Sequence, residues 1–439
     1  MTIALALPFE DLPAVWEILF TAAFVVIATM LVWTTLLFVR GEHARTRPPP
    51  APEDGADAYT WVFLVPALNE VLTIRDSVGR LLGLPVAGRH IVVVDDGSDD
   101  GTSEVLATLS APDLHVLRRD PPAAREGKAA ALNHGYRALS ALLGDVDRAR
   151  VIVVVVDADG RLAEDAPRYA AAHFADDARV GGVQVLVRIY NRDAVLTRLQ
   201  GVEFGVYGFL YQAGRTGWGA AGMGGNGQFN RLSALDDVAD HRGPWRDRLT
   251  EDQDLGLRLI GAGWEGRQDL RAVVEQQGLP GLRRLLRQRT RWSQGNLQAM
   301  GLLGVLMRAR LPLLVRLDQA AYLLQPVFQG LIGVALVAAL GLAAFDATPL
   351  WADTAWWQIL FFYLLGFGGV LLGCIARGAP RGVGGALRGV LVAQVYAFYS
   401  WLLWPVLVRA TVRQLTDRRA WAKTDREPPR ADEAPSATP

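Results

Sequence analysis

Two acidic residues stand directly after an apolar run in the middle of the chain. Residues 151–156 are six consecutive β-branched residues, and Asp157 and Asp159 follow them. Such a run is typical of a strand buried on both faces of a parallel sheet, and alternation along an extended chain would put both carboxylates on the same side at its carboxyl edge. Paired carboxylates could hold a divalent cation there. A plain strand followed by an Asp-Gly turn would give the same short motif.

The chain carries three more polar clusters whose residue types could do chemistry. A carboxylate in the first turn of a helix can take a proton from an attacking hydroxyl group, and an arginine can bind a phosphate through two hydrogen bonds. Acids that only offset a helix dipole, and a tryptophan that only anchors a helix at a membrane surface, are the alternatives. In chain order the clusters are Asp95 with Asp96, Glu251 with Asp252, and Gln288 with Arg291 and Trp292.

Alternating strand and helix patterns position these clusters. Strands are predicted at 59–65, 90–96, 114–117 and 180–189, and helices at 129–143, 194–211, 250–260 and from Asn69 onward, with Asn69 as the N-cap. This order predicts an α/β fold with a parallel, doubly wound sheet. Seven glycines between 214 and 227 indicate a loop that bends sharply or approaches a ligand closely.

Four apolar runs are long enough to cross a bilayer, which needs about 20 residues. They lie at 18–39, 319–345, 354–376 and 389–408. Arg40, Arg45 and Arg47 follow the first run, so the positive-inside rule predicts that residues 40–318 are cytosolic. The basic tail after residue 408 is then expected in the cytosol as well, which requires one of the last three runs to be re-entrant or the interfacial helix to be assigned wrongly.

The ordered clusters resemble the motifs of family 2 glycosyltransferases, the group that contains the cellulose, hyaluronan and chitin-oligomer synthases. The family pattern is D, DxD, (T/E)ED and (Q/R)xxRW, and this chain has VVVDDGSDDGT, DADG, TED and QRTRW in that order. PALNE at 66–70 and GKAAALNHG at 127–135 extend the resemblance over residues 59 to about 300. It implies a GT-A fold, with a Rossmann-like, mostly parallel sheet, and inverting transfer of a hexose from a UDP-sugar.

The resemblance also implies roles for individual residues. A Mg²⁺ or Mn²⁺ ion between the donor diphosphate and a carboxylate would let charge build on the leaving group, so we expect Asp159 to be the metal ligand with Asp157 beside it. Asp252 is the expected catalytic base, next to Glu251, and a single base fits one displacement with inversion, whereas glycosidases pair two carboxylates. The residues expected to bind the nucleotide-sugar are Pro66, Glu70, Asp95, Asp96, Lys128, Asp157, Gln288 and Arg291, and those expected to bind the acceptor are Trp292, Asn226 and Gln228.

Two acceptors compete. The segment 224–231, GGNGQFNR, departs from the polysaccharide synthases and is more similar to the bacterial and cyanobacterial family members that glucosylate diacylglycerol. Four spans also give little material for a pore around a sugar chain, and the basic amphipathic segment 282–292 could bring a lipid to the donor from the membrane surface. A lipid acceptor such as diacylglycerol is therefore favoured. A growing β-glycan is the alternative, because QRTRW is most familiar from processive synthases.

The composition excludes several other functions. The 45 basic and 45 acidic residues balance, which gives no indication of nucleic acid as a partner, and the six histidines fall in no zinc-ligand spacing. The spans contain few polar residues, unlike those of a transporter, and an inactive nucleotide-sugar-binding scaffold would be expected to have lost some of the acids. The sequence predicts a protein of the bacterial plasma membrane with an anchor at 1–40, a linker at 41–58, a cytosolic GT-A domain at 59–280, interfacial helices at 281–318, transmembrane helices at 319–408 and a basic tail at 409–439.

Overall fold

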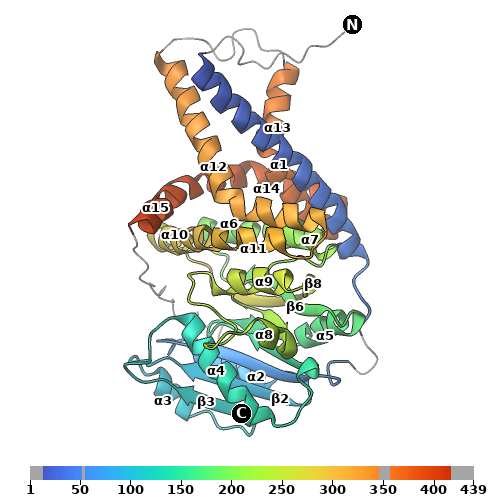
Figure 1. Ribbon diagram of the computed structural model, residues 1–439, viewed down its shortest axis with the longest axis vertical. Helices are drawn as coiled ribbons and strands as arrows, with labels where there is room; N and C mark the ends of the chain where they lie inside the picture. The colour runs from blue at the N-terminus through green and yellow to red at the C-terminus, as the bar shows by residue number, and fades with distance from the viewer. Residues whose placement is uncertain (1–12, 52–54, 346–355, 417–439) are drawn as a thin grey trace.

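The computed structural model describes residues 13–51, 55–345 and 356–416, which are arranged in three tiers along the long axis (Figure 1). A sheet with flanking helices lies at one end, and three long helices diverge at the other. They are α1 (Ala14–Thr46), α12 (Leu313–Phe345) and α13 (Trp356–Gly378). The middle tier consists of shorter helices, among them α6 (Val195–Val206), α7 (Ala213–Thr216), α10 (Leu282–Ala299) and α11 (Leu303–Arg308).

Eight strands form one mixed, mostly parallel sheet in the order β3-β2-β1-β4-β7-β6-β8-β5. Strands β1, β2, β3 and β4 are mutually parallel, and Phe63 of β1 lies between Ile91 of β2 and Val154 of β4. β7 is antiparallel to both of its neighbours, and β6 pairs with β8 in parallel. The strands are β1 (Thr60–Ala67), β2 (Arg89–Asp95), β3 (Leu114–Arg118), β4 (Val151–Val155), β5 (Arg161–Leu162), β6 (Val180–Ile189), β7 (Gln228–Arg231) and β8 (Glu265–Gln276).

Both faces of the sheet are covered, which is why β4, a central strand, is apolar and buried at every position. Successive residues of β1 alternate between two cores: Trp61 and Phe63 pack on one side, and Val62 and Leu64 on the other. Helices α2 (Ile74–Leu82), α3 (Thr102–Ala107) and α5 (Ala166–Asp176) contribute to the first core. Helices α4 (Lys128–Leu143), α8 (Leu232–Val238) and α9 (Glu251–Gly261) contribute to the second.

Several expected boundaries differ. Asn69 does not cap a helix: it has a positive φ of 55°, and α2 begins only at Ile74. The expected helix at 194–211 ends as a π-helix, η2 (Tyr207–Gln212). The expected linker at 41–58 begins late, because α1 continues to Thr46.

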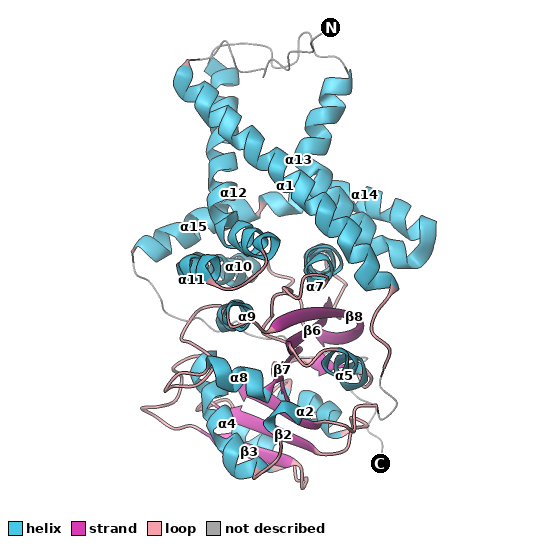
Figure 2. Cartoon of the chain, turned by 45° about the vertical axis from the view of Figure 1, so that its right-hand side comes forward, coloured by secondary structure: helices cyan, strands magenta, loops and turns pink. Residues whose placement is uncertain are grey.

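Among the residues that the structure describes, three stretches are long and apolar enough to cross a membrane: Ala14–Thr46, Leu313–Phe345 and Tyr363–Leu415, the last of which overlaps both the third and the fourth expected run. The run at 389–408, expected to be a separate span, is divided between α14 (Gly382–Trp401) and α15 (Leu403–Leu415). Both helices lie at the base of the three long helices, and α15 is the one beside α10 (Figure 2). Arg413 of α15 donates to the side chain of Gln294 in α10 at 3.1 Å.

Candidate active site

A cavity of about 460 Å³ lies between the carboxyl edge of the sheet and the middle tier of helices. Its wall includes residues from the ends of β1 and β4, the starts of α4 and α9, the glycine-rich loop before β7, and α10. Most of the residues that the sequence singled out line this cavity: Pro66, Glu70, Asp96, Lys128, Asp157, Asn226, Glu251, Asp252, Gln288, Arg291 and Trp292. The ordered motifs, which span more than 220 residues of sequence, therefore meet in one place.

A lysine lies at the centre of the acidic cluster. The Nζ atom of Lys128, the first residue of α4, is 2.6 Å from Asp157 Oδ1, 2.6 Å from the Gly225 carbonyl oxygen and 3.6 Å from Glu251 Oε1. Burial lowers the pKa of Lys128, but the charges of Asp157 and Glu251 outweigh burial and hold the pKa above its ordinary value. The ammonium group therefore stays charged, and it neutralises carboxylates that would otherwise repel one another.

Glu251 and Asp252 lie in the first turn of α9 and face the cavity. Burial raises the pKa of Glu251 to about 7, against the opposing charge of Lys128. Burial also raises the pKa of Asp252, and Lys128 again opposes the shift. A carboxylate whose pKa is raised toward neutrality is a better proton acceptor at physiological pH than an ordinary one.

The glycine-rich loop makes this close approach possible. A methyl group at Gly225 would lie 3.0 Å from Lys128 Nζ and 3.3 Å from Asp252 Oδ2, so any side chain there would crowd the charged cluster. Gly227 has a φ of +70°, a conformation that few other residues adopt. The side chain of Gln184, a residue that the sequence analysis missed, accepts a hydrogen bond from Gly224 N at 2.8 Å and donates to the Asn226 carbonyl at 2.8 Å.

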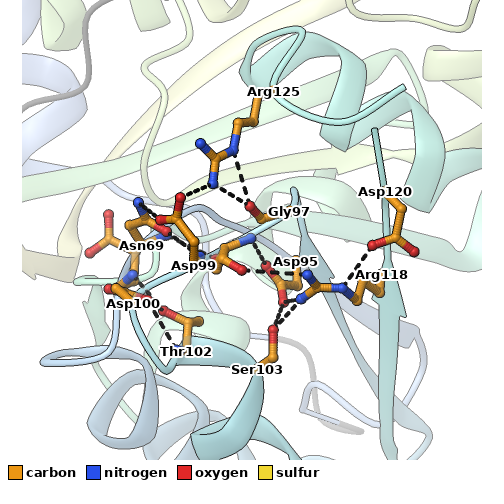
Figure 3. Close-up of polar contacts among 12 residues, drawn as sticks. Asn69, Asp95, Gly97, Asp99, Asp100, Thr102, Ser103, Arg118, Asp120 and Arg125 are labelled. Carbon is orange, nitrogen blue, oxygen red and sulfur yellow. Dashed lines mark hydrogen bonds and ion pairs between the residues drawn. The ribbon is translucent and has the colours of Figure 1, made fainter. Parts of the chain in front are cut away.

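Asp95 does not line the cavity. Its carboxylate is directed into the loop between β2 and α3, where it accepts hydrogen bonds from Ser98 N at 2.9 Å, Arg118 Nη1 at 2.8 Å and Ser103 (Figure 3). Burial raises the pKa of Asp95, but the hydrogen bonds from Ser103 and Ser98 outweigh it and lower the pKa overall. The structure thus places Asp95 in the support of the loop rather than on the cavity wall.

Asp96, the next residue, does reach the cavity, where its carboxylate pairs with the buried guanidinium of Arg119. Arg119 also pairs with Glu126 at 3.0 Å, in the loop that leads to Lys128. Asp96 therefore connects the end of β2 to the start of α4.

Asp159 and Gln228 lie behind the cavity wall. Asp157 and Asp159 were expected on the same side of an extended chain, but β4 ends at Val155. Asp157 instead begins a turn, in which Gly160 N donates a hydrogen bond to the Asp157 carbonyl at 2.7 Å. Asp159 is buried and accepts a long hydrogen bond of 3.4 Å from Gln277 N. Gln228 is buried within β7, where it pairs with Val155 of β4. Only Asp157 of the DxD pair thus lines the cavity.

An aromatic and charged group closes the side of the cavity formed by α10. The guanidinium of Arg289 lies 4.2 Å from the ring centroid of Trp292 and 2.7 Å from the carboxylate of Glu203 in α6. Tyr399 of α14 donates to the same carboxylate at 2.8 Å. Glu203 lines the cavity and was not predicted, although it is the only acid in the expected helix at 194–211.

The cavity extends to the first of the C-terminal long helices. Tyr322 and Gln325 of α12 line it, together with Tyr207 of η2 and Asn296 of α10. None of these was predicted as a site residue. The available signal was the amide of Gln325 inside an apolar run, since polar side chains in a membrane span usually serve a function.

The side chains in the acidic cluster that could ligate a metal are carboxylates, whose oxygens suit Mg²⁺ or Mn²⁺. Among the residues that the structure describes, no group of three His, Cys, Asp or Glu side chains is arranged to hold a metal by itself. A Mg²⁺ ion is commonly held by one or two carboxylates together with substrate phosphates and water. Asp157, on the cavity wall beside Lys128, fits that mode of binding.

Sequence comparison finds two family matches. The description Glycosyl transferase family group 2 matches residues 152–371, about half of the chain, and Glycosyl transferase family 2 matches residues 62–238. A β-monoglucosyldiacylglycerol synthase of Synechocystis is 33% identical over 65% of this chain and 60% of its own length. A poly-β-1,6-N-acetyl-D-glucosamine synthase of Staphylococcus epidermidis is 27% identical over 59% of this chain and 57% of its own length. The chain thus spans about 60% of the length of these relatives.

Structure comparison confirms the fold. A mannosyltransferase from Pyrobaculum calidifontis, solved with GDP-mannose and Mn²⁺, superimposes with a TM-score of 0.60 over 90% of this chain and 99% of its own, at 19% identity. The expected glycosyltransferase sheet, combined with candidate membrane helices at both ends, is therefore confirmed.

Proposed function

The chain belongs to glycosyl transferase family 2 and is a glycosyltransferase, and from this premise we propose that it moves a hexose from a UDP-sugar to a membrane lipid, such as diacylglycerol, with inversion. In the proposed reaction the acceptor hydroxyl attacks the anomeric carbon while the bond to the diphosphate breaks. The hydroxyl proton passes to the carboxylate of Asp252, which faces the cavity from the start of α9.

The donor diphosphate would lie between Lys128 and Arg291, whose positive charges offset the charge that builds on the leaving group. Pro66, Glu70, Asp96 and Gln288 line the adjacent wall, and Trp292 offers its ring to the acceptor. A Mg²⁺ or Mn²⁺ ion at Asp157 would add to this stabilisation of the diphosphate. Asp95 would act by shaping the loop that holds Asp96.

The observation that carries the lipid proposal is the extent of the cavity. It continues from the charged cluster to Tyr322 and Gln325, which lie on a helix long and apolar enough to cross a membrane. Gln325 is one of the exposed side chains of that helix. A lipid whose tails remain in the bilayer could thus present its hydroxyl group to Asp252. The glucosyldiacylglycerol synthase among the relatives supports the same acceptor.

The test uses the purified full-length protein in detergent, with diacylglycerol and labelled UDP-glucose, UDP-galactose or UDP-N-acetylglucosamine. We expect a lipid-soluble product with at least one donor, and about 10²-fold less or lower still from the Asp252→Asn variant. The second candidate is synthesis of a β-glycan, favoured by the poly-N-acetylglucosamine synthase among the relatives. A product that stays with the membranes, is insoluble in lipid solvents and is digested by a β-glycanase would reverse the ranking.

A further inference from the structure

A buried ion pair stands behind the membrane end of the cavity. Asp318 of α12 is fully buried, and its Oδ2 atom is 2.7 Å from Nε of Arg215 in α7. Its Oδ1 atom is 3.3 Å from Arg215 Nη2 and accepts a second hydrogen bond, of 2.8 Å, from the indole of Trp33 in α1. One carboxylate thus joins three elements that are far apart in the sequence.

The same pair touches the cavity wall. The guanidinium of Arg215 lies 4.7 Å from the centroid of the Tyr322 ring, and the hydroxyl group of Tyr322 is 3.4 Å from that of Tyr207. Tyr207 and Tyr322 both line the cavity. Asp252 lines the same cavity. A tyrosine hydroxyl group can both donate and accept a hydrogen bond, so the two hydroxyl groups can bind a polar group that enters this end of the cavity.

Stability alone is a poor reason for such an arrangement. Two charges taken out of water lose solvation that their mutual attraction often fails to recover, and well-packed apolar residues of similar size commonly serve a fold equally well. A bidentate pair, however, fixes the relative position of two elements more narrowly than apolar packing does. Here the pair fixes α7 relative to α12. Tyr207 lies in η2, which runs directly into α7, and Tyr322 lies on α12.

We propose that the hydroxyl groups of Tyr207 and Tyr322 bind the polar part of the acceptor beside its reacting hydroxyl group, and that the Arg215–Asp318 pair positions them. This inference rests on the proposed function, since it assigns the acceptor end of the same cavity. Tyr207 and Tyr322 contact the acceptor directly, whereas Arg215 and Asp318 act only through them.

The test separates acceptor binding from donor binding. Tyr207→Phe and Tyr322→Phe keep the rings and remove one hydroxyl each, and a lost hydrogen bond of this kind is expected to raise the acceptor KM about three- to tenfold. Asp318→Asn should raise it at least as much, because it weakens the support of both tyrosines. Donor affinity and the slow hydrolysis of the donor without acceptor should stay within about twofold of the parent for all three variants.

The matched control is another buried pair, His173 with Asp269 at 2.9 Å, which joins α5 to β8 and does not line the cavity. His173→Gln should lower the melting temperature but leave the acceptor KM unchanged. The parent enzyme is first assayed with lipid and with glycan acceptors, and the variants are compared on whichever acceptor it uses. Failure of the lipid proposal is thereby distinguished from failure of the proposal on the two tyrosines. An unchanged acceptor KM in both tyrosine variants, or a parallel loss of donor hydrolysis, would overturn the proposed role of the tyrosines.

Discussion

Asp252 and Glu251 are adjacent carboxylates with different surroundings. Glu251 Oε1 lies 3.6 Å from the lysine ammonium group, whereas Asp252 Oδ1 accepts a backbone hydrogen bond from Gln253 N at 2.9 Å. Asp252 is therefore the better candidate for accepting a proton from the acceptor. We expect Asp252→Asn to lower transfer about 10²-fold or more while the donor still binds. Glu251→Gln should retain more activity, and near-normal turnover of Asp252→Asn would contradict the assignment.

Either aspartate of the DxD motif could be the metal ligand, and the two assignments predict different metal requirements for the variants. If Asp157 is the ligand, as its place on the cavity wall favours, Asp157→Ala should need more Mn²⁺ for half-maximal activity and Asp159→Ala should not. If Asp159 is the ligand, as expected from the sequence, the ranking is reversed. Titration of Mn²⁺ with saturating donor measures both variants side by side, and no change in either would exclude this motif as the metal site.

The raised pKa of Glu251 links stability to pH. Its pKa is about 7 in the folded protein and 4.5 in the reference state, so between these values the folded state binds the extra proton. The contribution of Glu251 to the free energy of unfolding therefore falls as the pH rises from about 4.5 to 7. Relative to Glu251→Gln, the parent should lose melting temperature over this range and then level off. Glu164→Gln, at an exposed position, is the control and should follow the parent at every pH.

The sequence identified most cavity residues but not their orientation. Lys128, Asp157 and Asp252 could be found because each follows a strand end or starts a helix within a recognisable motif. Asp95 and Asp159 were expected to bind the donor or the metal because they follow strand ends within the family motifs. In the structure, the carboxylate of Asp95 accepts a hydrogen bond from Ser98 N and that of Asp159 from Gln277 N. Such orientations depend on hydrogen bonds between loops, for example with Ser103 or Gln277, that no short motif contains.

At the scale of elements, α13 and α14 are held together by glycines. A methyl group at Gly385 would overlap the backbone carbonyl of Gly378, and one at Gly389 would overlap that of Cys374. Close approach of this kind is typical of small residues in membrane helix pairs.

Gly385→Ala should therefore lower the melting temperature and weaken the packing of α14 on α13. Helix α14 contains Tyr399, which donates a hydrogen bond to Glu203. Gly384→Ala is the matched control: a methyl group there meets nothing within 4 Å, and alanine favours the helix by about 0.5–1 kcal/mol over glycine. Thermal unfolding of both variants in detergent measures the difference. Equal melting temperatures would show that the contact can relax without cost.

Elements with strong periodicity could be predicted, and those defined by tertiary contacts could not. β6 was expected over its exact bounds because six of its ten residues are Val, Leu or Ile. β7 is only four residues long and polar at three of them, and it exists because β4 and β6 flank it. The π-helical geometry of η2 likewise has no local signal, but its wider turn contributes Tyr207 to the cavity wall.

At the scale of the whole molecule, the division of residues 389–408 between α14 and α15 suggests a way out of the conflict over topology. If α1, α12 and α13 cross the membrane and α14 and α15 lie at its surface, both the glycosyltransferase domain and the end of α15 are cytosolic. We propose this orientation, which agrees with the positive-inside rule.

Single cysteines in a Cys374→Ala background test it. Phe345→Cys, at the far end of α12, should react with an impermeant thiol reagent in intact cells. Thr416→Cys, directly after α15, should react only after permeabilisation. Labelling of Thr416→Cys in intact cells would place the end of α15 outside.

The arginines that follow the first span bind backbone atoms of the middle tier. Arg40 donates to the Gly217 carbonyl at 2.9 Å, and Arg45 donates to the Phe209 carbonyl, within η2, at 2.7 Å. If α1 crosses the membrane, these bonds, which begin where its apolar part ends, would fix the height of Asp252 above the bilayer. If the acceptor is also a membrane lipid, as proposed, a hydroxyl group would react only at that height, and a lipid that has received one sugar would carry its remaining hydroxyl groups farther from the membrane. On this proposal we expect the enzyme to act as a ruler, with addition ending after the first sugar.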